Sequence, residues 1–172
     1  MKILVLMKQV ANKDAILRIN KDSNWIEEAD LSFEVNESDG YALEEALRIK
    51  EKVGGGEVVV CSMGPQRAKS VIKDALARGA DRAIHVLGDN VAHLSPFAAA
   101  SVLAQAIREE QADLIMTGLQ SDDYGYGQTG VILAELLGLP HATIVIEIDA
   151  TGEQLRVKRE LESGWYQWYT MP

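Results

Sequence analysis

The sequence predicts an α/β fold: a three-layer sandwich with a mainly parallel, Rossmann-like sheet and an antiparallel C-terminal strand pair. Short apolar runs alternate with longer segments of helical periodicity over most of the chain, which is the pattern of consecutive strand–helix units. The first run is mainly apolar, as expected for a strand buried on both faces of a parallel sheet. After residue 150, polar and apolar residues alternate instead, which indicates antiparallel strands.

The first part of the chain contains one strand, one hairpin and one helix. Residues 3–10 form a continuous apolar run and predict the first strand. Residues 16–28 hold two short apolar stretches around a turn-rich centre and predict a hairpin. In the helix that follows, Asn36 or Ser38 can cap the N-terminus, and the three glycines at 54–56 end it.

The remaining elements repeat the strand–helix rhythm. Pro65 opens one helix, which Gly79 ends, and Ser95-Pro96 begins another that runs to about residue 110. The predicted strands are residues 57–62, 82–87, 114–118 and 143–148, followed by the antiparallel pair at 154–160 and 165–169.

A polar, Gly-rich loop follows strand 114–118 and leads into an apolar-periodic helix at about residue 130. The loop and the first helical turn expose backbone N–H groups, and the helix dipole favours negative charge at that end. In open parallel sheets, ligands also collect outside the carboxyl ends of the strands. The sequence therefore predicts a nucleotide site at this loop.

Composition limits the class of protein. The 172 residues fit a single domain, and a net charge of −9 with a pI near 4.8 argues against a nucleic-acid surface. No apolar run approaches the roughly 20 residues of a membrane span, and the N-terminus lacks the pattern of a signal peptide. The single cysteine, Cys61, allows no internal disulfide and fits a reducing compartment such as the cytoplasm.

Motifs for side-chain chemistry are weak. Residues 125–130 match G-x-G-x-x-G, but the match begins seven positions after Gly118, too late for a strand-to-helix turn, and no P-loop sequence is present. Asp122 and Asp123 could bind a cation or act as general acid and base, but side-chain turns within the loop are the favoured interpretation. The three histidines have no ligand-spaced partner, and no metal site is predicted.

The chain resembles the β subunit of electron transfer flavoproteins along nearly all of its length. The most specific similarity is Thr117–Asp123 together with Gly127–Gly130. The other matching segments are Ile3–Val10, Asn36 with Ala42–Leu47, Ser62–Pro65, Ala75–Ala83 and Leu155–Glu160.

The resemblance implies an electron-carrier subunit and not an enzyme. In this family an α and a β subunit form a heterodimer around one redox-active FAD, which the α subunit mostly holds. The heterodimer takes electrons from acyl-CoA and related dehydrogenases and passes them to a membrane quinone oxidoreductase. The β subunit holds AMP in ordinary members and a second FAD in electron-bifurcating members.

The resemblance also implies the site residues, by position. Backbone N–H groups of the loop would hold the phosphate, while Asn36 and the strand-end backbone would read the adenine. The implied cofactor-binding residues are Leu6, Asn36, Glu37, Ser38, Asp39, Met63, Gly118, Leu119, Gln120, Ser121, Asp122, Asp123, Tyr124, Gly125, Tyr126, Gly127, Gln128 and Thr129.

Three departures from the family pattern matter. Family chains continue into a segment that wraps the α subunit and carries a dehydrogenase-docking loop, which this chain is expected to lack. The acidic-Gly pattern usual after Arg159 is altered to Glu160-Leu161-Glu162-Ser163-Gly164. An aromatic cluster follows it and indicates a strand that needs a partner: Trp165, Tyr166, Trp168 and Tyr169. Tyr124-Gly125-Tyr126 differs from common versions of the loop and leaves AMP or FAD open.

Two other functions remain as alternatives. An adenine-nucleotide-binding regulatory module of stress-protein type would bind ATP as a lone homodimer, without flavin or an α subunit. An ATP pyrophosphatase would need a Ser-Gly-Gly turn after the first strand, where this chain has Lys8-Gln9-Val10-Ala11-Asn12.

Overall fold

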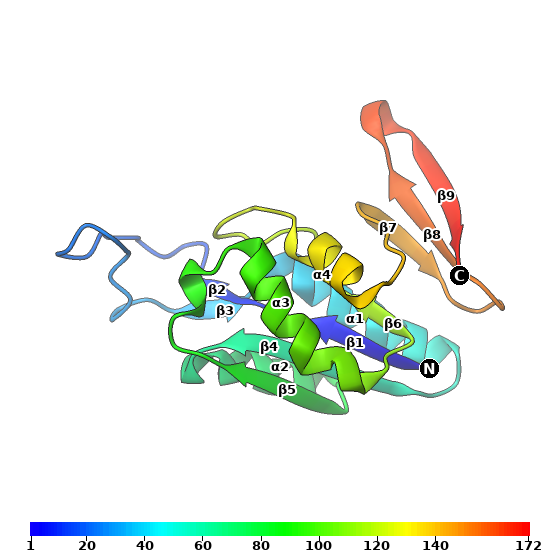
Figure 1. The fold of residues 1–172 in the computed structure, drawn as a ribbon, viewed down its shortest axis with the longest axis horizontal. Coiled ribbons are helices and arrows are strands. Elements are labelled where there is room, and N and C mark those ends of the chain that lie inside the picture. Colours follow the sequence, from blue (N-terminus) through cyan, green and yellow to red (C-terminus); the bar gives the residue numbers. More distant parts are fainter.

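A computed structural model describes residues 1–172 and has a four-stranded parallel sheet at its centre (Figure 1). The strands are β1 (Lys2–Leu6), β4 (Glu57–Gly64), β5 (Arg82–Leu87) and β6 (Leu114–Met116), in the spatial order β5-β4-β1-β6. The chain moves outward from β1 to β5 and then returns to the other side of β1. The strand order therefore reverses between β1 and β6, the place where open α/β sheets bind ligands.

Helices cover both faces of the sheet and confirm the predicted three layers. The first face carries α1 (Glu37–Lys52) and α2 (Lys69–Arg78), and the second carries α3 (Pro96–Ile107) and α4 (Thr129–Leu137). Side chains of β1 alternate between the two cores: Ile3 and Val5 pack against α1, whereas Leu4 and Leu6 lie in the core of α3 and α4. A strand with a core on each side has no face for polar residues, which explains the unbroken apolar runs.

The predicted helix boundaries have clear causes. The Ser95 hydroxyl accepts a hydrogen bond from the Ala98 amide and caps α3, with Pro96 in the first turn. Gly79 ends α2 in the left-handed region, with φ of 119°. Four short 3-10 helices complete the connections: η1 (Gln66–Ala68), η2 (Val91–His93), η3 (Arg108–Glu110) and η4 (Glu162–Gly164).

The prediction of one strand over residues 3–10 is wrong. β1 ends at Leu6, and β2 (Gln9–Ala11) pairs antiparallel with β3 (Phe33–Val35) in a separate ribbon. The break occurs at Lys8. The Lys8 amide donates to the Asp39 carboxylate, and the Lys8 carbonyl accepts the Asn36 amide. The start of α1 therefore takes the hydrogen bonds that would have continued the parallel ladder.

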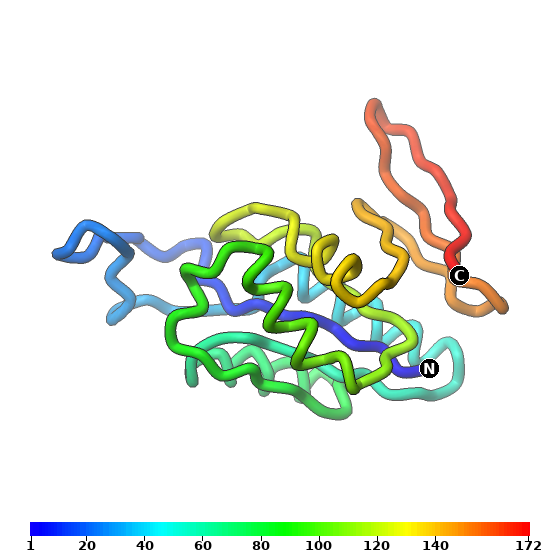
Figure 2. The backbone as a smooth tube through the Cα atoms, viewed as in Figure 1, coloured from blue at the N-terminus to red at the C-terminus, as the bar shows by residue number.

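The hairpin predicted at 16–28 is reduced to a single bridge. Ile19 and Ile26 form an isolated antiparallel bridge within a projection of residues 12–32, which we call the arm. Figure 2 shows the arm extending from one end of the molecule, in blue. Ile16 and Ile19 are 77% and 75% exposed. Two backbone hydrogen bonds flank the bridge, from the Asn20 amide to the Trp25 carbonyl and from the Glu27 amide to the Arg18 carbonyl.

A second, antiparallel sheet forms the C-terminal part of the chain. It contains β7 (Val145–Asp149), β8 (Leu155–Glu160) and β9 (Tyr166–Met171), in that order. β8 and β9 are the predicted pair. The strand predicted at 143–148 is β7, but it joins this sheet rather than the parallel one, because a short turn brings it back antiparallel against β8. Figure 1 shows this sheet standing apart from the central one.

Candidate nucleotide site

The predicted site residues all lie at the carboxyl edge of the parallel sheet. Leu6 ends β1, Met63 lies near the end of β4, residues 36–39 begin α1, and residues 118–129 connect β6 to the first residue of α4. Residues 36–39 and 118–122 touch directly through hydrogen bonds. The side chains of Leu6 and Met63 belong to the core beneath α3 and α4, so these two residues can reach a ligand through their main chains.

Asn36 holds the loop in place. Its side chain is only 1% exposed. Its Nδ2 donates to the Gln120 carbonyl at 2.9 Å, and its Oδ1 accepts the Asp122 amide at 2.9 Å. Ser38 adds a second bond to the same carbonyl, from Oγ at 2.8 Å. Asn36 occupies the N-cap position of α1, as predicted, but its side chain spans the gap to the loop instead of capping the helix.

Asp39 joins the two strands on either side of the switch point. Its carboxylate accepts the Lys8 amide at 2.8 Å, just beyond β1, and the Gly118 amide at 2.9 Å, just beyond β6. Burial raises the pKa of Asp39 to about 6, and the hydrogen bonds from Lys8, Asn36 and Gly118 only partly offset that rise. We call these paired contacts the Asp39 clamp.

Gly118 is required by the Asp39 clamp. A Cβ atom at this position would overlap Asp39 Oδ1 and Ser38 Oγ, and would lie 2.8 Å from the Asp39 backbone nitrogen. The helix backbone cannot retreat from that contact without breaking the first turn of α1. The close approach of loop and helix therefore depends on the missing side chain.

Lys8 is a site residue that the sequence did not single out. Its Nζ pairs with Asp123 Oδ1 at 2.6 Å and reaches Ser121 Oγ at 3.3 Å. Burial raises the pKa of Asp123, but the hydrogen bonds from Lys8 and Ser121 outweigh it and hold the pKa below its usual value. The available signal in the sequence was a single basic residue, Lys8, directly after the apolar residues of the first strand, in a chain whose Gly-rich loop is acidic.

The N-termini of α1 and α4, the two helix ends beside the switch point, differ. At α1 the Glu37 amide donates to Asp122 Oδ2 at 3.2 Å, so a carboxylate of the chain itself occupies that end. At α4 the first amides, of Thr129, Gly130 and Val131, have no acceptor within the helix, and Gln128 supplies no side-chain cap. The α4 terminus is therefore the better place for an external anion.

Glycines shape the approach to α4. Gly125 and Gly127 have φ of 64° and 61°, the left-handed region that ordinary side chains rarely adopt. A Cβ at Gly130 would lie 2.7 Å from Thr117 Oγ1. Together these positions keep the backbone of the loop and of the first helical turn bare, as a phosphate cradle requires.

Comparison with known proteins identifies the family. The sequence profile of the electron transfer flavoprotein domain matches residues 23–168. The chain belongs to the electron transfer flavoprotein family. Proteins named electron transfer flavoprotein subunit beta from Dictyostelium discoideum and Bradyrhizobium diazoefficiens are 37% and 39% identical to it over 164 residues, which is 95% of this chain. The protein of that name from Methylophilus methylotrophus is 37% identical over 170 residues.

The match covers only part of the length of each relative. This electron transfer flavoprotein chain spans 65%, 65% and 64% of the lengths of the three relatives. The region that the family profile matches, residues 23–168, contains the carboxyl-edge loop and the start of α4.

No group of three His, Cys, Asp or Glu side chains converges to hold a metal ion. Burial raises the pKa of the Cys61 thiol to about 12, which keeps it from acting as a thiolate. His85 Nε2 lies 3.0 Å from the Gly64 carbonyl, a structural contact. None of the helices has the length and apolarity needed to cross a membrane.

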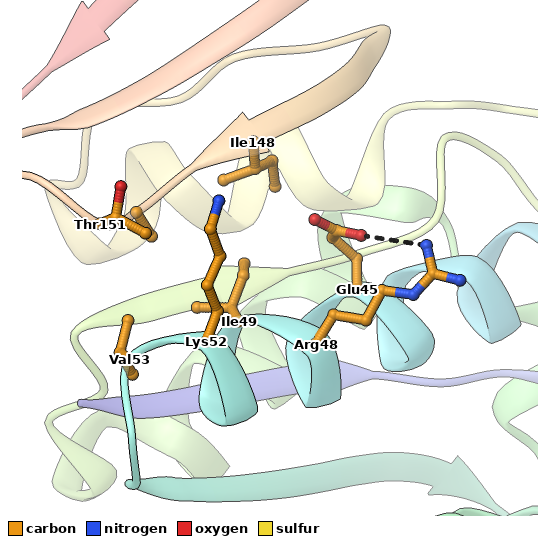
Figure 3. Close-up of a pocket in the computed structure, with 8 residues that line it drawn as sticks. Glu45, Arg48, Ile49, Lys52, Val53, Ile148 and Thr151 are labelled. Atoms are coloured by element: carbon orange, nitrogen blue, oxygen red, sulfur yellow. Dashed lines mark ion pairs between the residues drawn. The ribbon is translucent and has the colours of Figure 1, made fainter.

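A small cavity lies at the other end of the sheet and is separate from this site (Figure 3). It encloses about 40 Å³ between the last turns of α1 and the β7 sheet, lined by Glu45, Arg48, Ile49, Lys52, Val53, Ile148, Ala150 and Thr151. Small-molecule sites enclose roughly 300 Å³ or more. The cavity marks the seam where the antiparallel sheet rests on α1.

Proposed function

We propose that this chain is the nucleotide-binding part of an electron transfer flavoprotein β subunit and carries AMP at the carboxyl edge of its sheet. The observation that supports the proposal most strongly is the loop 118–128, where glycines leave parts of the backbone without side chains. The loop leads into the N-terminus of α4, which has no side-chain cap and lies beside the switch point. Backbone amides at such a terminus suit a phosphate group. We choose an adenine nucleotide as the ligand because the chain belongs to the electron transfer flavoprotein family, whose β subunits are expected to hold AMP or a second FAD.

The residues around the loop divide into two roles. The amides of Thr129 and the following residues hold the phosphate, with Gly125, Gly127 and Gln128 shaping the approach. Asn36, Ser38 and the Asp39 clamp hold the loop against α1. The adenine contact expected of Asn36 stays a prediction. Both hydrogens of its side-chain amide already donate within the protein, to Ser38 and to the Gln120 carbonyl.

The wider function rests on flavin chemistry supplied together with an α subunit. FAD held between the two subunits carries the electrons, and this chain provides position and electrostatics for it. The electrons come from acyl-CoA or related dehydrogenases and leave to a quinone oxidoreductase. A second FAD in place of AMP would make the heterodimer a bifurcating one. Bound AMP stabilises the folded loop by mass action.

Nucleotide release tests the proposal directly. The chain is purified with and without a co-expressed α subunit, then denatured, and the released nucleotide is identified by chromatography and absorbance. AMP from the chain, with one FAD per heterodimer, is the expected result. Two FAD per heterodimer would assign the loop to a second flavin. ATP from a lone homodimer would favour the regulatory-module alternative and overturn the proposal, as would the release of no nucleotide from either preparation.

A further inference from the structure

Four aromatic rings form a chain of contacts across the carboxyl edge of the sheet. His93 follows β5, one edge strand, while Tyr124 and Tyr126 follow β6, the opposite edge strand. Trp25, from the arm, links the two sides: its ring lies 4.6 Å from His93 and 6.1 Å from Tyr124, and Tyr124 stacks on Tyr126 at 5.5 Å. We call these four residues the aromatic roof. The family resemblance assigns no role to Trp25 or His93.

Contacts with Glu28 and, through it, with Arg67 hold the Trp25 ring in position. Its Nε1 donates to Glu28 Oε1 at 2.9 Å, and Glu28 pairs with Arg67 at 3.0 Å. Arg67 lies in η1, directly after β4, and its guanidinium lies 4.3 Å from the Phe33 ring centroid. This series of contacts fixes the ring above the strand ends, as an anchor residue in a binding site requires.

The roof also connects to the loop that would hold the phosphate. Lys8 Nζ lies 5.0 Å from the Tyr124 ring centroid, and the Lys8 amide belongs to the Asp39 clamp. Tyr126 and Thr129 are three positions apart in the sequence, so at most about 11 Å of extended chain separates the roof from the start of α4. A single mononucleotide can therefore touch both.

Ring surface in the roof remains available for a ligand. Tyr124 is 37% exposed and Tyr126 is 56% exposed. A planar ligand can cover an exposed tyrosine ring favourably, because stacking adds to the free energy gained from burying apolar area. Purine bases are such partners, and stacking on aromatic side chains accounts for much of their binding when hydrogen bonds do not read the base.

We propose that the aromatic roof is the base-binding subsite of this chain, and that Trp25 of the arm and Tyr124 of the loop stack on the purine while the α4 amides hold the phosphate. The arm is then part of the ligand site rather than an inert projection. This inference rests on the proposed nucleotide function and adds to it the residues that recognise the base.

Two ligands that share a phosphate separate base binding from phosphate binding. AMP and ribose 5-phosphate compete against labelled AMP in equilibrium dialysis with the purified chain, in the wild type and in Trp25→Leu and Trp25→Phe. Stacking predicts that Trp25→Leu weakens AMP about tenfold and leaves ribose 5-phosphate unchanged. Trp25→Phe should weaken AMP less than Trp25→Leu, because it keeps an aromatic ring but loses the Nε1 hydrogen bond to Glu28. Equal weakening of both ligands in Trp25→Leu would show that the ring only orders the arm, and would overturn the inference.

Fluorescence provides a readout that needs no loss of the ring. The chain has three tryptophans, so Trp165→Phe with Trp168→Phe leaves Trp25 as the only indole. AMP is expected to quench its emission at saturation, whereas ribose 5-phosphate is expected to leave it unchanged. AMP binding without any change in emission would place the base elsewhere. If the wild-type chain binds neither ligand, the proposed nucleotide function itself is wrong. If it binds AMP but the Trp25 emission does not change, only the proposed base-binding subsite is wrong.

Discussion

The N-termini of α1 and α4 lie at the same edge of the sheet but are used in opposite ways. At α1, the Asp122 carboxylate accepts a hydrogen bond from the Glu37 amide. At α4, nothing in the chain caps the first turn from a side chain. Both ends carry the same helix dipole. The difference shows that contacts from distant residues, and not the dipole, decide which helix end is available to a ligand.

The difference also assigns the two ends separate tasks. The α1 end holds the loop through the Asp39 clamp and the Asn36 side chain, both of which are buried. The α4 end keeps its backbone bare through Gly125, Gly127 and Gly130. Changes at α1 should therefore alter stability first, whereas changes at α4 should alter nucleotide binding first.

Gly118→Ala should have the largest effect. The new Cβ would overlap Asp39 and Ser38, break the Asp39 clamp and leave a buried carboxylate short of a donor. We expect a loss of about 2–4 kcal/mol in the free energy of unfolding, measured by urea denaturation. Gly40→Ala is the matched control, since nothing lies within 4 Å of its Cβ, and it should stabilise α1 by up to about 1 kcal/mol. Equal effects of the two substitutions would refute the close approach.

Asp39→Asn should change the pH dependence of stability. The folded-state pKa of Asp39 is about 6, against an ordinary value of 3.8, so the folded chain binds this proton more tightly than the unfolded chain. The resulting stabilisation is complete below the unfolded pKa and is lost as the pH rises through the folded value.

The free energy of unfolding of the wild type, minus that of Asp39→Asn, should therefore fall by about 3 kcal/mol as the pH rises from acid to neutral. Urea denaturation at a series of pH values measures this difference and removes the contributions of the other carboxylates. A difference that stays constant with pH would mean that Asp39 is not buried in the way described.

Gly130→Val should act on the α4 end alone. Its Cβ would meet Thr117 Oγ1 at 2.7 Å, and the valine would cover the amides that we propose to receive the phosphate. We expect AMP affinity to drop at least about tenfold, with the free energy of unfolding changed much less than in Gly118→Ala. Gly152→Val, in the turn between β7 and β8, is the control. Unchanged AMP affinity in Gly130→Val would remove α4 from the site.

Lys8→Met should have the smallest effect. Lys8 and Asp123 have side chains that are 39% and 35% exposed, so solvent screens their ion pair. Removing it should cost about 0.5–1 kcal/mol, with the cost shrinking in high salt. The comparison is Arg48→Met, which removes the more exposed pair with Glu44 and should cost less. A larger loss in Arg48→Met would contradict the assigned burial of Lys8.

Local patterns predicted the parts of the fold whose causes are local. The apolar runs at 57–62 and 82–87 became β4 and β5, and the Ser95-Pro96 signal marked the start of α3. These features depend on the burial of neighbouring residues and on caps a few positions away. The loop after β6 was found for the same reason, since its glycines and polar residues are adjacent in the sequence.

Predictions failed where a distant residue competes for a hydrogen bond or a strand edge. The first strand was drawn too long because Asp39, 31 positions away, takes the Lys8 amide. β7 was grouped with the parallel strands because its apolar residues suit either sheet, and only its pairing with β8 decides between them. Trp25 and His93 were passed over because nothing in their immediate sequence shows that the two rings meet.

The sequence by itself determined the layers of this protein, the position of its carboxyl-edge loop and its family, because burial patterns and motif spacing are carried by neighbouring residues. Only the tertiary structure decided which helix end is filled and which is bare. That choice depends on bonds such as Asn36 to Gln120, across 84 positions, and Asp39 to Gly118, across 79. No local pattern encodes such bonds, because they exist only once the sheet has brought the ends of β1 and β6 side by side.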